Sequence, residues 1–166
     1  MKYLFLFVLT PILLLAQGPN ANFDDQPLTS DHIITIYEDG DGWLKNYDEA
    51  MADAKKEDRN VLIYFTGSDW CPPCKMLKTD LFDTEAFKDI ASNYTLLYID
   101  MPRNRELLSP EQMKHNSELL NKINKKGVFP LLVVLNKKGS RLDEYSGYSM
   151  NGEVQYHMEL LNKYKE

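Results

Sequence analysis

Apolar and polar positions along residues 46–166 follow two alternating patterns. Three short runs are almost wholly apolar, as in strands that lie inside a sheet with both faces covered: 61–66, 95–99 and 131–135. A further β-prone run, 32–37, lies ahead of them and is predicted as an edge strand. The segments between the runs carry apolar residues at three- and four-residue spacing, which predicts amphipathic helices.

Four amphipathic helices are predicted from this spacing. They begin at Asn46 or Asp48, at Thr84, at a capping box over 109–112, and at Gly152. The second is expected to end at Tyr94, the third at about Asn124 and the fourth at about Lys163. The apolar stripes are Tyr47, Ala50, Met51 and Ala54; Phe87, Ile90, Ala91 and Tyr94; Leu119, Leu120 and Ile123; and Val154, His157, Met158 and Leu161. His157 is interpreted as a packing residue.

A β-hairpin is predicted before the last helix. Gly139 is placed for positive φ in the turn 136–140, and 141–145 returns antiparallel to the third apolar run. The order of strand, helix, strand, helix, hairpin and helix predicts an α/β sandwich, with a mixed central sheet flanked by helices.

The first sixteen residues have the pattern of a secretory signal peptide. Lys2 precedes the almost continuous apolar run 3–15, which is too short to span a bilayer. We therefore predict a signal peptide at 1–16, a polar leader at 17–45 and one folded domain at 46–166. The protein is then periplasmic or secreted, with no stable membrane insertion after cleavage. An uncleaved anchor or a buried helix is the alternative.

The charge balance narrows the choice of partners. The 166 residues include 19 basic and 25 acidic ones, a net charge of −6, and removal of the segment holding Lys2 would make it −7. An acidic chain repels phosphate backbones and anionic lipid surfaces. Nucleic acid is therefore not expected as a partner.

The two cysteines of the chain, Cys71 and Cys74, follow the first apolar run and open a helix-like segment. Residues three apart on a first helical turn hold their sulfurs within bonding distance. Pro72 suits the first helical position, and the positive end of a helix favours a thiolate. A strand, a tight turn and a helix headed by such a pair predict a dithiol redox site.

Three other roles for the cysteines compete with a dithiol redox site. A structural zinc site needs four ligands, and the chain offers two cysteines and three scattered histidines, His32, His115 and His157. A purely structural disulfide across two residues adds little stability by loop entropy. Two buried bystander thiols are the third alternative, although a Trp-Cys-Pro-Pro-Cys-Lys sequence is a poor core helix.

The segment 65–75, Phe-Thr-Gly-Ser-Asp-Trp-Cys-Pro-Pro-Cys-Lys, resembles the active site of the thioredoxin superfamily. It is most similar to thioredoxin-like thiol-disulfide proteins of bacterial cell envelopes, including the reductase domain of membrane disulfide-interchange proteins. The resemblance covers about 47–164 and implies a thioredoxin-like three-layer sandwich. It also implies a cis peptide bond between Phe129 and Pro130, beside the dithiol. Trp70, Phe129 and Pro130 would then form the substrate-binding surface.

The sequence departs from that family at two positions. Phe129 is bulkier than the β-branched residue usual before the cis proline, and the other departure lies on the strand before the dithiol. The family carries a buried acid on the strand before the dithiol, where this chain has Tyr64. The role of that acid is unfilled or passes to another group, with Asp69 the nearest candidate. Pro72, Pro73 and Lys75 are further residues expected to modulate the dithiol.

These observations together predict an extracytoplasmic thiol-disulfide oxidoreductase. Cys71 is expected to be the exposed nucleophile and Cys74 the resolving thiol. Partners would be protein thiols and disulfides, with a membrane electron donor. No metal or organic cofactor is implied, because the redox carrier is the Cys71–Cys74 disulfide. The direction favoured is disulfide reduction. A disulfide isomerase or oxidase of the same fold, and a non-catalytic thioredoxin-fold binding module, are the alternatives.

Overall fold

The computed structural model describes residues 42–165. They fold around a mixed four-stranded sheet. The strands lie in the order β2-β1-β3-β4. β1 pairs with β2 in parallel and with β3 antiparallel, and β4 returns antiparallel along β3. The bounds are β1 Asn60–Thr66, β2 Tyr94–Asp100, β3 Leu131–Leu135 and β4 Arg141–Ser146. The predicted α/β architecture with a mixed sheet is confirmed.

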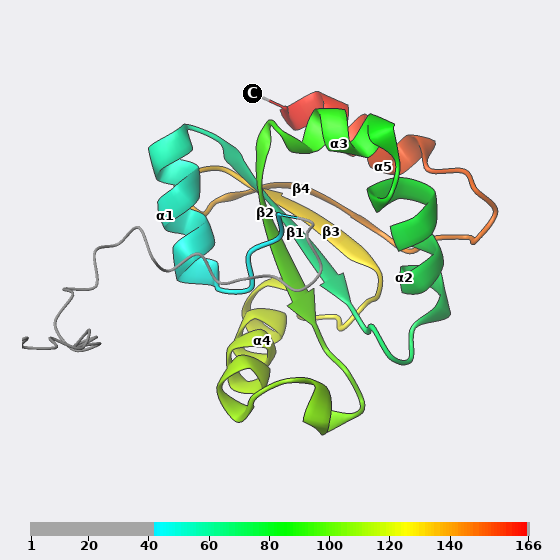
Figure 1. The fold of residues 1–166 in the computed structure, drawn as a ribbon. Helices are drawn as coiled ribbons and strands as arrows, with labels where there is room; N and C mark the ends of the chain where they lie inside the picture. Colours follow the sequence, from blue (N-terminus) through cyan, green and yellow to red (C-terminus); the bar gives the residue numbers. More distant parts are fainter. Residues whose placement is uncertain (1–41, 166) are drawn as a thin grey trace, which may run out of the picture. The chain divides into compact units, whose positions relative to one another are not determined.

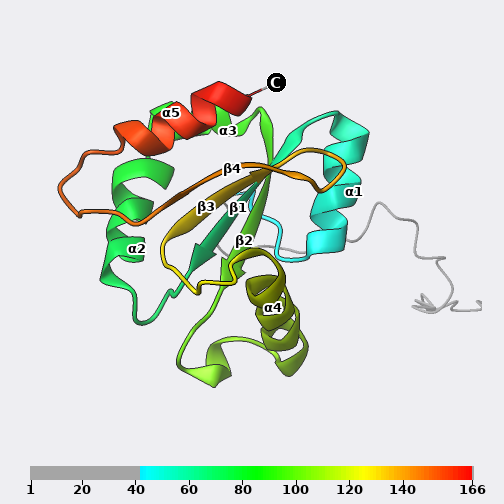
Figure 2. The same ribbon diagram turned by 180° about the vertical axis from the view of Figure 1, so that it is seen from behind.

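Five α-helices in the described residues cover the two faces of the sheet (Figures 1 and 2). On one face lie α1 (Tyr47–Glu57) and α4 (Pro110–Ile123). On the other lie α2 (Pro72–Leu77), α3 (Glu85–Ala91) and α5 (Gln155–Tyr164). A π-helical turn, Lys78–Phe82, continues α2, and a 3-10 turn, Arg105–Leu107, precedes α4. The result is the three-layer sandwich that the sequence predicts.

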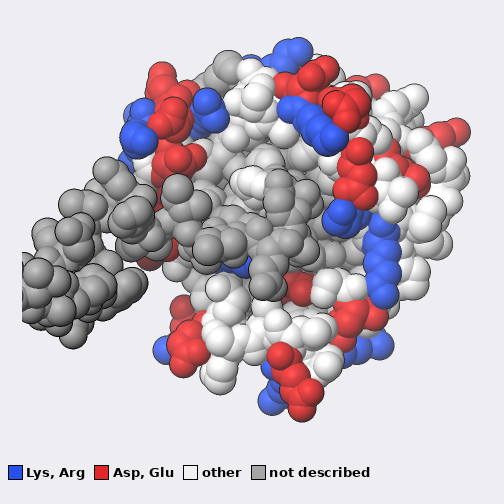
Figure 3. Space-filling view, viewed as in Figure 1, with Lys and Arg blue, Asp and Glu red and all other residues white. Residues whose placement is uncertain are grey.

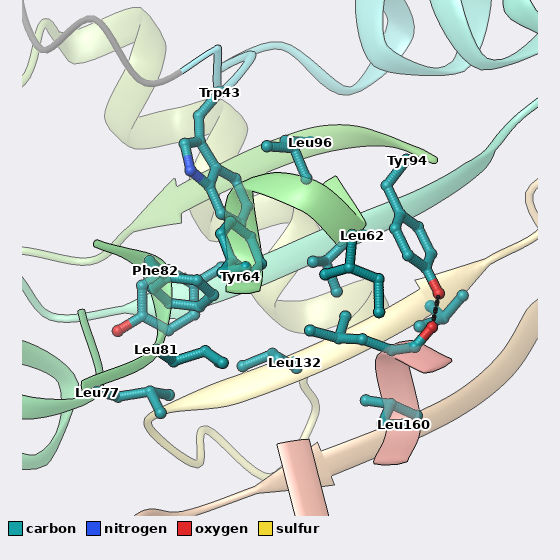
Figure 4. Close-up of a cluster of buried hydrophobic side chains, with 14 of the residues drawn as sticks. Trp43, Leu62, Tyr64, Leu77, Leu81, Phe82, Tyr94, Leu96, Leu132 and Leu160 are labelled. Carbon is teal, nitrogen blue, oxygen red and sulfur yellow. Dashed lines mark hydrogen bonds between the residues drawn. The ribbon is translucent and has the colours of Figure 1, made fainter. Parts of the chain in front are cut away.

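The alternation of side chains along the strands builds a separate core on each face. Leu62 and Tyr64 of β1 enter the core under α2, α3 and α5, whereas Ile63 and Phe65 enter the core under α1 and α4. Figure 4 shows the first of these cores, in which rings and leucines from several elements meet. All seven residues of β1 are buried, as expected for a central strand with a helix layer on each side.

The capping residues explain where several helices begin. The Asn46 side chain accepts hydrogen bonds from two backbone N–H groups of the first turn of α1, and the Thr84 hydroxyl caps α3. Only half of the predicted capping box at α4 forms. The Ser109 hydroxyl accepts from the Gln112 N–H at 3.1 Å, but the Gln112 side chain donates to the Lys45 carbonyl at 2.9 Å. That bond ties α4 to the segment before α1.

Two predicted helix ends are wrong. The sequence extends the second amphipathic helix to Tyr94, but α3 ends at Ala91 and Tyr94 opens β2. There its hydroxyl donates to the Leu161 carbonyl at 2.7 Å, a long-range contact that local spacing does not reveal (Figure 4). The last helix begins at Gln155 because Gly152 has φ of +79°, which a right-handed helix excludes.

The packed part of the chain begins earlier than residue 46. Trp43 is only 8% exposed and lies among the rings of the core under α2 (Figure 4). Leu44 pairs with β2, since its N–H donates to the Leu96 carbonyl and its carbonyl accepts from the Tyr98 N–H, both at 2.8 Å. The predicted leader therefore contributes to the domain. The predicted signal peptide at 1–16 and edge strand at 32–37 lie outside the described residues.

The surface of the described residues carries mixed charge. Figure 3 shows acidic and basic side chains interspersed over the part of one face that is not grey. None of the helices between residues 42 and 165 has the length and apolar character needed to cross a membrane.

Candidate active site

Cys71 and Cys74 form a disulfide at the N-terminus of α2, with their Cα atoms 5.3 Å apart. Cys71 is the N-cap residue, and its sulfur accepts a hydrogen bond from the Cys74 N–H at 3.3 Å. Pro72 and Pro73 occupy the first two helical positions, where a missing N–H costs least. The predicted strand, turn and helix thus place both cysteines at the positive end of a helix.

The prediction that Cys71 is exposed does not hold in this oxidised form. Cys71 is 3% exposed and Cys74 is 1% exposed, so burial hardly separates them. Their positions differ instead, because Cys71 precedes the helix and Cys74 lies within its first turn.

Trp70 is held rigidly beside the dithiol. Its indole N–H donates to the Met101 carbonyl at 2.8 Å, and its ring lies over Gly67, where any side chain would collide with it. The ring of Phe129 meets it edge-on with the centroids 5.4 Å apart, and the Arg103 guanidinium lies 4.6 Å from the ring centroid. Two of the predicted substrate-binding residues, Trp70 and Phe129, are therefore in contact.

The Phe129–Pro130 peptide bond is cis, as predicted from the resemblance. Pro130 is buried and Phe129 is half-buried. The Pro130 carbonyl accepts a hydrogen bond from the Gly147 N–H at 2.8 Å, which fixes the segment that precedes β3.

Tyr64 lies beneath the dithiol helix. Its hydroxyl donates to the Cys74 carbonyl at 3.0 Å and its side chain is almost fully buried. Burial is the main cause that raises the pKa of Tyr64 to about 12. Tyr64 therefore stays protonated at neutral pH and serves as a hydrogen-bond donor to the active-site helix.

The chain is similar to known proteins in both sequence and fold. A family model described as thioredoxin-like matches residues 42–137, which is more than half of the chain. The chain belongs to the thioredoxin-like family. The match includes the dithiol, α2 and the cis proline segment.

Individual relatives of the thioredoxin-like family agree with this assignment. The disulfide bond reductase DsbH of Chlamydia pneumoniae is 27% identical over 71 residues, which are 42% of this chain and 42% of that protein. The solved structure of a DsbH oxidoreductase has a TM-score of 0.62 and 27% identity, over 72% of this chain and 81% of that one. A disulphide isomerase from Xylella fastidiosa shares the fold alone, with a TM-score of 0.52 and 17% identity over 76% and 93% of the two chains. The class that these relatives indicate is thiol-disulfide oxidoreductase.

Asp69 does not have the surroundings of the acid that other members of the superfamily carry near the dithiol. Its carboxylate accepts hydrogen bonds from the Arg103 and Asn104 N–H groups at 2.8–3.1 Å, and the Asn104 bond is the main cause that lowers the pKa of Asp69. The Lys75 ammonium donates to the Asp69 carbonyl at 3.1 Å. Asp69 thus fastens the loop that follows β2, and a carboxylate of low pKa is a poor proton acceptor.

The acidic residue that the sequence analysis missed is Asp100, the last residue of β2. It is 6% exposed and pairs in register with Thr66, so it lies at the same end of the sheet as the dithiol. Its carboxylate accepts hydrogen bonds from the Ser68 N–H at 2.8 Å and the Ser68 hydroxyl at 2.5 Å. Burial is the main cause that raises the pKa of Asp100. The signal in the sequence is its place at the end of a strand parallel to β1, because such ends meet at one edge of a sheet.

A cavity of about 170 Å³ adjoins the inner cysteine. Rings from Trp43, Tyr64, Phe82 and Tyr98 form much of its wall. Cys74 also lines it. The sequence gives no sign of this cavity, since its wall comes from four separate segments of the chain.

Metal-binding residues are not grouped in the part of the chain that the structure describes. Within residues 42–165, no cluster of three or more His, Cys, Asp or Glu is arranged to hold an ion. His115 bonds to the Tyr47 N–H at 3.0 Å, and His157 is buried on α5.

Proposed function

We propose that this protein is a thiol-disulfide oxidoreductase that works through the Cys71–Cys74 pair. The observation that carries the proposal is the disulfide at the N-terminus of α2, flanked by the Trp70–Phe129 contact. The similarity to DsbH supports the same class, although the curated DsbH protein is matched over 42% of its own length.

The reaction proceeds by two exchanges. The Cys71 thiolate attacks one sulfur of a substrate disulfide, and the other substrate sulfur leaves as a thiolate that takes up a proton. The Cys74 thiolate then attacks the Cys71 sulfur, the bond from Cys71 to the substrate breaks, and the second substrate thiol is released. Two electrons have passed from the dithiol to the substrate disulfide.

The direction we propose is reduction of protein disulfides. A helix N-terminus stabilises a thiolate through its backbone N–H groups as well as through its dipole. Pro72 and Pro73 have no N–H, and the Cys74 N–H is the donor to the Cys71 sulfur. A less stabilised thiolate gives a more reducing couple, because oxidising power comes from stability of the reduced form.

A glutathione redox titration of the full domain tests this direction. A midpoint more negative than about −180 mV, the value of protein disulfide isomerase, is expected. A more positive midpoint would place the protein with isomerases and oxidases and would end the reductase proposal.

The roles of the two cysteines are tested by trapping. Cys74→Ser is expected to hold substrates as mixed disulfides through Cys71, and Cys71 is expected to be alkylated faster than Cys74 in the reduced protein. Cys71→Ser is the matched control and should trap nothing. A protein with both substitutions that still performs its biological task would favour the binding-module alternative.

We also propose that the protein acts outside the cytoplasm and receives electrons from a membrane donor. The segment after Lys2 supports export, and a reductase in an oxidising compartment needs a supply of electrons. Mature protein from its native cell should begin near Gln17. Recovery of the intact chain from the cytosol would contradict this location.

A further inference from the structure

The second exchange requires the buried Cys74 thiol to lose its proton. This inference rests on the function proposed above, in which Cys74 attacks as a thiolate. The Cys74 side chain is only 1% exposed. Burial raises the pKa of a thiol, because it disfavours the charged form. An acceptor within reach of Cys74 is therefore needed at neutral pH.

Three residues with hydroxyl groups line the cavity that Cys74 adjoins. Tyr64, Thr66 and Ser68 occupy alternate positions of β1 and the residues that follow it, and all three line the same cavity as Cys74. A volume of about 170 Å³ has room for several water molecules, and hydroxyl groups give such water polar partners.

The last of these residues, Ser68, is bonded to a buried carboxylate. The Ser68 hydroxyl donates to Asp100 at 2.5 Å, so a proton that reaches Ser68 has a direct route to the carboxylate. Within residues 42–165, no lysine or arginine forms an ion pair with Asp100. Its pKa is raised by burial, which makes it a better proton acceptor than an exposed aspartate.

We propose that Asp100 is the proton acceptor for Cys74, reached through water in the cavity and the Ser68 hydroxyl. The Cys74 S–H bond breaks, water passes a proton to the Ser68 oxygen, and Ser68 passes its own proton to Asp100. The resulting thiolate attacks the Cys71 sulfur, and the electron pair of the broken disulfide leaves on the substrate sulfur. Asp100 returns its proton to solvent by the same route after the exchange.

Other titratable groups around Asp100 have different roles. Tyr64 holds its proton, since its pKa is about 12. Asp69 raises the pKa of Asp100 by charge repulsion, and Lys75 stands on the cavity wall together with Lys45 and Lys78. On the α4 side, the Asn116 amide donates to the Asp100 backbone carbonyl at 2.8 Å, and His115 bonds to Asn116 rather than to Asp100.

The second exchange can be timed directly with an aromatic disulfide, dithiobis(nitrobenzoate). Reduced protein releases one coloured thiolate when Cys71 attacks and a second when Cys74 resolves the mixed disulfide. With Asp100→Asn, we expect the second release to slow by about 10²-fold at neutral pH, within the range for general acid–base catalysis. The defect should shrink toward alkaline pH, where the thiol ionises without help.

Two further variants separate a proton route from a structural effect. Ser68→Ala removes the relay hydroxyl but keeps the backbone N–H that bonds Asp100, so it should show the same pH-dependent slowing even if Asp100→Asn fails to fold. Asp53→Asn is the matched control. Asp53 also accepts from a hydroxyl, that of Thr95, at 2.7 Å, but it lies on α1, across the sheet from the dithiol, and its substitution should leave the second release unchanged.

The outcomes distinguish this inference from the proposed function. An unchanged pH profile in Ser68→Ala, or a slowing that is equal at every pH, overturns the proton route. Loss of the second release in the unsubstituted protein would instead contradict the Cys71–Cys74 exchange itself.

Discussion

The two faces of the central sheet are equally well buried but differ in chemistry. The face under α1 and α4 packs β1 through the hydrocarbon side chains of Val61, Ile63 and Phe65. The face under α2, α3 and α5 packs Tyr64 among rings from other elements, with hydroxyl groups reaching the backbone (Figure 4). The dithiol lies on this second face.

This difference indicates that one strand serves two purposes through its alternate residues. Odd-numbered positions of β1 face the hydrophobic core under α1 and α4, and their burial holds the strand in place. Even-numbered positions, Tyr64 and Thr66, present hydroxyls to the cavity beside Cys74. Stability and reactivity should therefore respond separately to substitutions at adjacent residues.

The largest effect on stability is expected on the face under α1 and α4. Ile63 is fully buried, so Ile63→Ala should lower the free energy of unfolding by about 2–5 kcal/mol through lost burial and a cavity. Denaturant unfolding measures this loss. In the native state, the alkylation rate of Cys71 should not change, and a changed rate would break the proposed separation of the two faces.

Gly67→Ala should act mainly on the face that carries the dithiol. A Cβ at this position would overlap the Trp70 ring, whose indole N–H bonds to Met101. Displacing the ring should cost about 1–3 kcal/mol of unfolding free energy, as in overpacked sites. Tryptophan fluorescence should report the displaced ring, and substrate reduction should weaken. An unaltered spectrum with full activity would show that the position of Trp70 does not matter.

A smaller effect is expected for Tyr64→Phe. The variant loses the hydrogen bond to the Cys74 carbonyl, which still accepts from the Lys78 N–H, so the cost should be about 1 kcal/mol. Because Tyr64 keeps its proton at neutral pH, the pH profile of the second thiolate release should be retained. Loss of that profile would make Tyr64, and not Asp100, the proton-handling residue.

The smallest effect concerns His157, a buried residue of α5 on the same face. Burial is the main cause that lowers the pKa of His157, and its ring donates from Nε2 to the Gly147 carbonyl at 3.2 Å. The unfolded chain binds a proton near the ordinary histidine pKa of about 6.5, whereas the folded protein does so only at lower pH. Stability is therefore fully present above that value and is lost as pH falls through the folded pKa.

His157→Gln tests this dependence with a side chain that does not titrate. Its amide N–H can replace the bond to Gly147, so stability above neutral pH should change little. Urea unfolding across the acid range should show a shallower decline than in the unsubstituted protein. Identical slopes would assign the acid sensitivity to other groups.

Local sequence patterns predict most of the fold because the relevant signals are short-range. The strands at 60–66 and 131–135, the caps at Asn46 and Thr84, and the dithiol helix all follow from neighbouring residues. Tyr94 was misassigned because its helical spacing competes with pairing to Asn60, 34 residues earlier in the chain. Its contact with Leu161 spans 67 residues of the sequence.

In the active site too, residues with local motifs are predictable from the sequence, and contacts between distant segments are not. Cys71, Cys74 and the cis bond before Pro130 carry strong local motifs. The bond between Ser68 and Asp100 joins the turn after β1 to the last residue of β2, 32 residues later in the sequence. The buried environment that distinguishes Asp100 from Asp69 arises only when β1 and β2 pair.

The central position of β1 has a consequence for motion. This strand is hydrogen-bonded to a neighbour on each side, so its amides should exchange with deuterium only in the rarest openings of the domain. The 3-10 turn 105–107, on the exposed loop fastened by Asp69, should exchange far sooner. The dithiol is thus attached to the strand whose amides exchange most slowly. The nearby loop with the 3-10 turn 105–107 should open and exchange much faster. A cycle of oxidation and reduction can then proceed at the end of β1 without loosening the strand that carries it.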